Sequence, residues 1–503
     1  VLENATVLTM ADEHPETHAL AIQGGRILAL GEDALDPGLR GPNTRVMDLD
    51  GRTVLPGFVD CHTHAARLGE LHFRADLHEV PDKHAALDIL TQRAERTPPG
   101  GWVIAWNWDE STWTDQEPLT PEDLETVSRE HPIMARRVCG HKAVVNRRAL
   151  EELSLPDKTP GLVTADGSPT GLLTEDAADI AWERCAPTYE TCKKGLTIES
   201  KRLASLGITT VADTAGPRDI ELLTRGTREG WFLQRAGMYV REELLDHLEA
   251  LRLGTIGAPR CRLLGVKTYT DGSIGARTAA TTEPYRDEDT TGMLLRDAKQ
   301  VEALAARATE LGLQLKAHAI GDAAIQAVLD GVRHAQVPRR LRPRLEHLEM
   351  VRADQLQAMA ELGVLAVIQP NFIGNWQGPE GLYQAAVGTE RRLAMNPLAS
   401  VLEAGVPLAF SSDGMPYHPL YGIRCALEHP NPAERLTVEQ ALAAYTRGAA
   451  YALGMEQEIG TLEEGKLADL IVLDEDPRSH APVDEVGIAL TMVGGRIVHE
   501  AGA

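Results

Sequence analysis

The sequence predicts an α/β protein: a (β/α)₈ TIM barrel with a small composite β-sandwich from both termini and a long insert after barrel strand 1. Three observations predict it. Apolar strand-like runs alternate with helical patterns through the middle of the chain. Both ends carry short alternating runs separated by Gly-Gly or Asp-Gly turns. About 140 residues separate the first two barrel strands, far more than an ordinary βα loop.

The two ends of the chain share one hairpin pattern, because "GGRILAL" at 24–30 is nearly repeated by "GGRIVHE" at 494–500. We therefore predict that residues 1–55 and 456–503 form the composite β-sandwich. Residues 56–455 then form the barrel domain. Within that domain, residues 70–200 form the insert subdomain.

Eight apolar runs predict the barrel strands, since each is followed by apolar residues at helical spacing. An open doubly wound sheet is the alternative, because a strand count taken from sequence can err by one or two. In order, the runs are "GFVDCHTH", "GITTVADT", "FLQRAGMYV", "LLGVKTYTDGS", "LQLKAHAIGD", "PRLEHLEM", "VLAVIQPN" and "VPLAFSSDG".

The amino-acid composition indicates which kinds of partner and which cellular location to expect. The net charge of −24 disfavours a nucleic-acid or membrane partner, because both present negative charge. Six scattered cysteines without a CxxC pair indicate reduced thiols in a cytoplasmic protein: Cys61, Cys139, Cys185, Cys192, Cys261 and Cys425. No signal-like segment opens the chain and no apolar run approaches the roughly 20 residues of a membrane span.

Polar side chains with metal-binding chemistry end five of the predicted strands. His62 and His64 are two residues apart, so a strand would point both imidazoles the same way. The others are Lys267, His318, His347 and Asp413. Chemistry in a barrel lies at the C-terminal strand ends. Imidazole and carboxylate donors suit a divalent ion, zinc above all, which lowers the pKa of a bound water to about 7.

Lys267 is the unusual member of this set. An ammonium group cannot bind a metal, and burying it unpaired in a barrel would be costly. A neutral amine could add carbon dioxide and give a carbamate able to bridge two metals. An ion pair with Asp271 or Asp413 is the simpler alternative, and spacing does not decide between the two.

The motifs "GFVDCHTH", "KTYTDGS", "HAIGD", "LEHLEM", "FSSDGMP" and "GTLEEGKLADLIVLD" resemble the amidohydrolase superfamily. More narrowly, they resemble its third amidohydrolase family, which includes N-substituted formamide deformylases. The resemblance implies one or two divalent metal ions. It also implies that Lys267 corresponds to a lysine that is commonly carbamylated in such proteins. It also implies the metal-centre residues His62, His64, Lys267, His318, His347 and Asp413.

The resulting hypothesis is that hydroxide generated at the metal attacks an amide-type carbonyl. Asp413 would act as general base and then as general acid toward the leaving nitrogen. His141 in "GHKAVVN" is a candidate for stabilising the oxyanion. Candidates for substrate binding are Glu175, Asp271, Ser273 and Trp108. Bracing of the insert, turn formation and core packing are the alternative roles of these weaker candidates.

The leading function is hydrolysis of a non-peptide, amide-type C–N bond of a small molecule. A deaminase or an ester or lactone hydrolase is the alternative within enzymes, and a non-catalytic scaffold is the alternative outside them. The sequence contains no phosphate loop and no GxSxG elbow, so no nucleotide cofactor and no serine nucleophile are predicted. A homodimer is left open.

Overall fold

A computed structural model describes residues 1–78, 80–138, 140–185, 187–479 and 481–502. The chain forms two compact units, residues 1–66 with 197–503 and residues 67–196. Cys139 lies outside the described residues. The other five cysteines are free and buried, so packing accounts for them.

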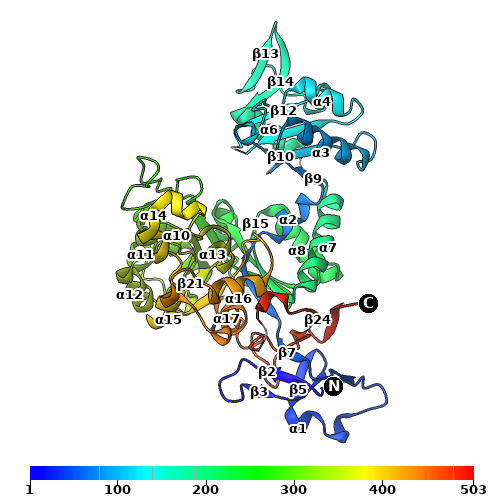
Figure 1. Cartoon of the computed structure of the whole chain (residues 1–503), viewed down its shortest axis with the longest axis vertical. Coiled ribbons are helices and arrows are strands. Elements are labelled where there is room, and N and C mark those ends of the chain that lie inside the picture. The colour runs from blue at the N-terminus through cyan, green and yellow to red at the C-terminus, as the bar shows by residue number, and fades with distance from the viewer. Residues whose placement is uncertain (79, 139, 186, 480, 503) are drawn as a thin grey trace. The chain divides into compact units, whose positions relative to one another are not determined.

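The first unit contains the barrel, and its eight parallel strands coincide with the eight predicted runs (Figure 1). Neighbouring strands pair in chain order. The first and last approach each other, because Asp413 N donates to His62 O at 3.0 Å. The predicted barrel is thereby confirmed. Its strands are β8 (Phe58–Thr63), β15 (Ile208–Ala215), β16 (Arg235–Arg241), β18 (Cys261–Tyr269), β19 (Gln314–Ala319), β20 (Arg344–His347), β21 (Leu365–Ile368) and β22 (Leu408–Phe410).

Helices between these strands cover the barrel, and α10 (Ala298–Glu310) shows why they form. Asp297 and Gln300 make a reciprocal capping box at its N-terminus. Its buried positions are Val301, Leu304, Ala305 and Ala308, which is one helical face. The other helices include α8 (Pro217–Glu229), α9 (Leu245–Leu251), α11 (Asp322–His334), α12 (Ala353–Leu362), α13 (Pro370–Trp376), α14 (Leu382–Ala394), α16 (Pro419–Leu427) and α17 (Val438–Tyr445).

Both termini build two further sheets, which confirms the predicted composite sandwich. One sheet runs β5-β4-β1-β6 and the other runs β25-β24-β23-β7-β2-β3, so strands from the two ends pair directly. The strands are β1 (Leu2–Glu3), β2 (Thr6–Leu8), β3 (Glu16–Thr17), β4 (Leu20–Gln23), β5 (Arg26–Leu30), β6 (Met47–Asp48), β7 (Thr53–Pro56), β23 (Leu470–Leu473), β24 (Ile488–Val493) and β25 (Arg496–Glu500). Apolar residues of both sheets share one core.

One buried ion pair joins this sandwich to the barrel. Arg235 begins β16, and Asp469 immediately precedes β23. The Arg235 guanidinium contacts both Asp469 oxygens, at 2.5 and 3.0 Å. Gly494 N also donates to Asp469 Oδ1 at 2.6 Å. The pair therefore fixes a terminal sheet to a barrel strand.

The second unit has its own sheet, with the order β13-β14-β12-β11-β10-β9. Trp108 ends β10 (Val103–Trp108) and is fully buried in the core of this unit. This burial favours the core-packing alternative for Trp108, and a contact with substrate stays a prediction. The other elements include β9 (Arg74–Asp76), β11 (Ile133–Arg137), β12 (Lys142–Val145), β13 (Leu162–Ala165), β14 (Ser168–Thr174), α3 (Lys83–Glu95), α4 (Pro121–Val127), α5 (Arg147–Leu153) and α6 (Glu175–Arg184).

The two ends of this unit are held close together. Gly69 lies in α2 (Ala65–Leu71) and Gly195 lies in α7 (Tyr189–Ser205). A Cβ atom at Gly195 would overlap the carbonyl oxygen of Gly69, and a Cβ atom at Gly69 would overlap the backbone of Leu196. Glycine is therefore required at both positions for this close approach of backbones.

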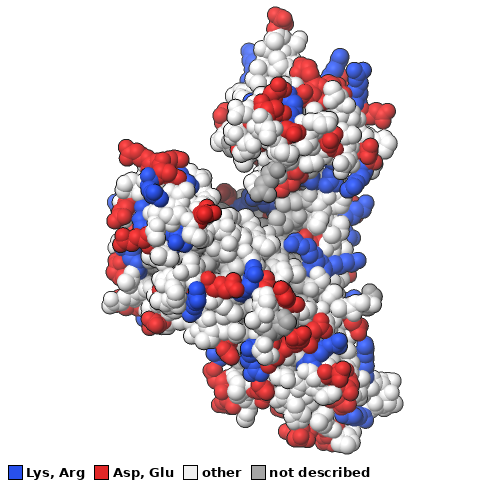
Figure 2. Space-filling model, viewed as in Figure 1, with Lys and Arg blue, Asp and Glu red and all other residues white. Residues whose placement is uncertain are grey.

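Acidic and basic side chains are interspersed over the face drawn in Figure 2, so the negative charge does not gather there in one patch. Among the described residues, none of the helices combines the length and the apolar character that crossing a membrane requires.

Candidate metal centre

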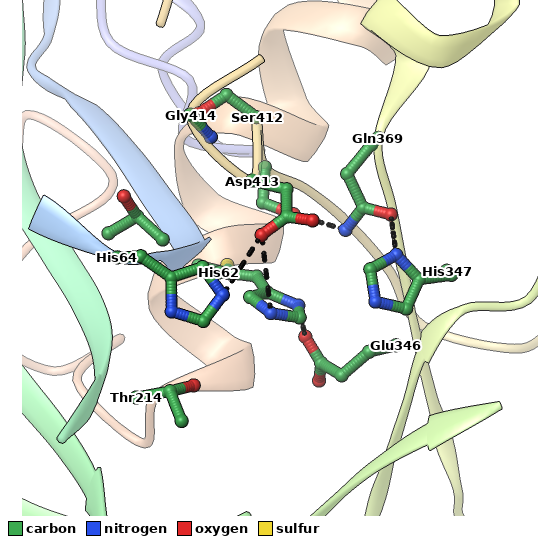
Figure 3. A network of polar contacts seen from close by, with 12 residues as sticks. His62, His64, Thr214, Glu346, His347, Gln369, Ser412, Asp413 and Gly414 are labelled. Atoms are coloured by element: carbon green, nitrogen blue, oxygen red, sulfur yellow. Dashed lines mark hydrogen bonds and ion pairs between the residues drawn. The ribbon is translucent and has the colours of Figure 1, made fainter. Parts of the chain in front are cut away.

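Three predicted ligands converge where the first and last barrel strands meet (Figure 3). His64 Nε2 lies 3.2 Å from Asp413 Oδ1, and His62 Nε2 lies 3.7 Å from the same oxygen. One donor atom from each residue lies within 4.8 Å of the others. His62 lies near the end of β8 and His64 directly follows the strand, and both imidazoles approach the same Asp413 oxygen.

His318 and His347 extend this cluster from β19 and β20. The ring centroids of His318 and His347 are 4.4 Å apart, and those of His62 and His347 are 5.0 Å apart. His347 Nδ1 contacts Gln369 Oε1 at 2.7 Å, whereas His318 Nε2 contacts Gly272 O at 2.9 Å. Because each oxygen occupies one ring nitrogen, His347 keeps Nε2 for a ligand and His318 keeps Nδ1.

Lys267 is buried in the barrel, and its ammonium nitrogen has no hydrogen-bond partner among the described residues. Nζ lies 4.8 Å from the centroid of the Tyr269 ring. Burial and the positive charge of Lys316 lower the pKa of Lys267 to about 7. The orphaned amine and the neighbouring imidazole and carboxylate donors fit a cation centre that includes this side chain.

The electrostatics of the site favour the ligand forms of these groups. Burial lowers the pKa of His62 and of His347 well below the ordinary value, and it lowers that of His318 to about 4. Burial alone would raise the pKa of Asp413, but the hydrogen bond with His64 lowers it below its ordinary value. Neutral imidazoles and an ionised carboxylate are the forms that bind metals.

Two buried residues on β20 lie beneath this cluster and were not predicted as site residues. Glu346 Oε2 lies 2.6 Å from His62 Nδ1, and Arg344 contacts both Glu346 oxygens. Alternation along "RLEH" was the available signal, since it places Arg344 and Glu346 on one strand face. The sequence could not show that this face meets β8.

Asp60 was also missed. It accepts from Ser412 N at 3.1 Å and from Ser412 Oγ at 2.5 Å, and so links β8 to the segment that carries Asp413. Burial raises the pKa of Asp60 to about 7.

Asp271, a predicted substrate-binding residue, uses its carboxylate for contacts within the protein. Its buried carboxylate accepts from the backbone N–H groups of Ala280, Ile320 and Gly321, at 3.0, 3.1 and 2.8 Å. Asp271 Oδ1 also lies 3.4 Å from His318 Nε2. The carboxylate therefore holds the loops around His318, and its role in substrate binding stays a prediction.

The remaining candidates lie on exposed surfaces. Ser273 Oγ accepts from Ala276 N at 3.3 Å in an exposed turn. His141 and Glu175 belong to the second unit, where His141 Nδ1 contacts Glu175 Oε2 at 3.0 Å. Their roles at the reaction centre stay predictions.

The chain resembles known proteins over nearly its whole length. The sequence model of the Amidohydrolase family matches residues 45–499. An N-substituted formamide deformylase of Arthrobacter pascens is 28% identical, covering 99% of this chain and 97% of its own. An uncharacterized metal-dependent hydrolase from Pyrococcus furiosus is 31% identical with a TM-score of 0.81, covering 95% and 99%. Another from Pyrococcus horikoshii OT3 is 28% identical with a TM-score of 0.82, covering 95% and 98%. With these donors at the strand ends of its barrel, the chain belongs to the Amidohydrolase family.

Proposed function

We propose that this protein is a metal-dependent hydrolase that cleaves a non-peptide, amide-type C–N bond of a small molecule. The observation that supports it most is the convergence of His62, His64 and Asp413 within 4.8 Å. The neighbouring His318, His347 and unpartnered Lys267 add further donors. The name of the A. pascens relative, an N-substituted formamide deformylase, supports an N-formyl substrate.

The six residues would hold one or two divalent ions, and zinc suits the imidazole and carboxylate donors best. Such an ion polarises a carbonyl and makes water a nucleophile at neutral pH. Asp413 accepts the proton of the attacking water and passes it to the leaving nitrogen. The lowered pKa of Asp413 keeps its carboxylate ionised at neutral pH, which is the form that can bind a cation or act as a base.

Lys267 is proposed to carry a carbamate. Its neutral amine adds carbon dioxide and releases a proton, which turns a base into an anion with two oxygen donors. The lowered pKa of Lys267, about 7, supports this step because an appreciable fraction of the amine is unprotonated at neutral pH. The absence of a hydrogen-bond partner for Nζ among the described residues supports it as well.

A direct test measures metal content and turnover together. The purified protein is analysed for bound metal and assayed on N-formyl, N-acyl and cyclic amides. Esters and lactones test the alternative of an ester or lactone hydrolase, and amino-heterocycles test the alternative of a deaminase. We expect stoichiometric bound metal and release of an amine from the substrate. Removal of the metal by a chelator should abolish turnover, and added zinc should restore it. A well-folded protein that binds no metal and turns over nothing would favour the scaffold alternative. The cytoplasmic location and the homodimer stay predictions.

A further inference from the structure

Beneath the candidate metal centre, a fully buried ion pair contacts one of the ligands from behind. Arg344 Nε lies 2.5 Å from Glu346 Oε1 and Arg344 Nη2 lies 3.0 Å from Glu346 Oε2. The same Oε2 lies 2.6 Å from His62 Nδ1. The side chains of Arg344 and Glu346 are each 0% exposed, so no solvent competes for these contacts.

Arg344 is itself held in place by the strand that carries His62. Its Nη2 donates to Cys61 O at 2.6 Å, and its Nη1 donates to Tyr239 Oη at 3.2 Å. Cys61 directly precedes His62 in β8. One guanidinium therefore fixes both the carboxylate behind the imidazole and the backbone beside it.

The chemistry of this contact decides the state of the His62 ring. Among the described residues His62 Nδ1 has no hydrogen bond of favourable geometry, so its contact with Glu346 is an electrostatic one. At 2.6 Å an ionised carboxylate, which can only accept hydrogen bonds, repels a lone pair on Nδ1 and favours a hydrogen on that atom. The lone pair then lies on Nε2, the nitrogen that points toward Asp413. His347 is treated differently, because its Nδ1 meets the neutral amide oxygen of Gln369. A charged acceptor makes His62 the more electron-rich donor of the two.

We propose that Glu346, clamped by Arg344, is a positioning residue that fixes the tautomer and orientation of His62 and so sets the cation affinity of the His62–His64–Asp413 cluster. The inference rests on the metal centre of the proposed function. The competing explanation is that Glu346 only balances the buried positive charges of Arg344, Lys316 and Lys267.

Two variants separate contact from charge balance. Glu346→Asp keeps the negative charge and can still meet Arg344, but it is one methylene shorter and withdraws from His62. Glu346→Gln keeps the length and removes the charge. If Glu346→Gln does not fold, Glu346→Asp alone decides, because it leaves the buried arginine paired.

Zinc affinity of each folded, metal-stripped protein is measured by competition with a chromophoric chelator, and the cobalt-loaded protein is examined by visible absorption. We expect Glu346→Asp to bind zinc about 10–100-fold more weakly than wild type and to change the cobalt spectrum. Glu434→Gln is the control. Glu434 is another buried glutamate, and it accepts from Ser400 N and Ser400 Oγ, at 3.0 and 2.6 Å. We expect this variant to bind zinc as wild type does.

The outcomes distinguish the two proposals. A wild-type protein that binds neither zinc nor cobalt would contradict the metal centre itself. A wild-type protein that binds zinc, with Glu346→Asp equal to it in affinity and cobalt spectrum, would leave the metal centre standing and overturn the role given to Glu346.

Discussion

Asp413 is the proposed general base and general acid, so substituting it tests the proposed proton transfer directly. Asp413→Asn keeps the size of the side chain near His62 and His64 but cannot accept a proton. We expect kcat to fall by about 10²–10⁴-fold, the usual contribution of a general base. Circular dichroism and metal analysis check that fold and loading persist. Turnover equal to wild type would remove Asp413 from the mechanism.

The pKa of Lys267 sets the direction of a pH experiment. Carbon dioxide adds only to the neutral amine, and burial with the charge of Lys316 lowers the pKa of Lys267 to about 7. Carbamylation should therefore increase as pH rises through about 7. Nuclear magnetic resonance with isotopically labelled bicarbonate measures it. The carbamate signal should grow with pH in wild type and be missing from Lys267→Arg, whereas a wild-type protein without that signal at any pH contradicts the carbamate.

At the scale of strands, the closure between β8 and β22 depends on Asp60. Asp60→Ala leaves the buried Ser412 N–H and Oγ–H without their acceptor. We expect a loss of about 1–3 kcal/mol in the free energy of unfolding. We also expect weaker zinc binding, because Asp413 directly follows Ser412. Urea unfolding followed by tryptophan fluorescence measures the first effect. Unchanged stability and unchanged zinc affinity would show that Asp60 does not brace the site.

The barrel strands could be predicted from sequence, because alternation and strand-end polarity are local properties. The candidate ligands His62, His64, His318, His347 and Asp413 followed from the same reasoning, since parallel strands end on one rim. Partners across the barrel could not be predicted. Which strand faces Glu346 depends on the stagger of the strands and on how the barrel closes. Neither property is determined by a run of neighbouring residues. Trp108 shows the related limit, because an apolar strand end is equally consistent with a core and with a binding surface.

At the scale of the whole molecule, the terminal sandwich and the barrel belong to one compact unit, and Arg235–Asp469 is a buried connection between them. Asp469→Ala leaves the Arg235 charge buried and unpaired. We expect a loss of about 3–5 kcal/mol in the free energy of unfolding. Denaturant unfolding measures it, with Asp476→Ala as the control, because Asp476 pairs with Arg478 near the surface. Equal losses in the two variants would contradict a special role for the buried pair.

The glycine contact between α2 and α7 has a consequence for exchange of the segment between them. Gly69 and Gly195 bring the two ends of residues 67–196 close together. This long segment therefore leaves and re-enters the chain of the first unit over a short distance, as a turn would. None of the eight barrel strands lies between the two glycines, so replacing the residues between them would leave the hydrogen-bond ladder of the barrel intact. Such an exchange would keep the candidate metal donors, which lie outside the segment, and would remove His141 and Glu175.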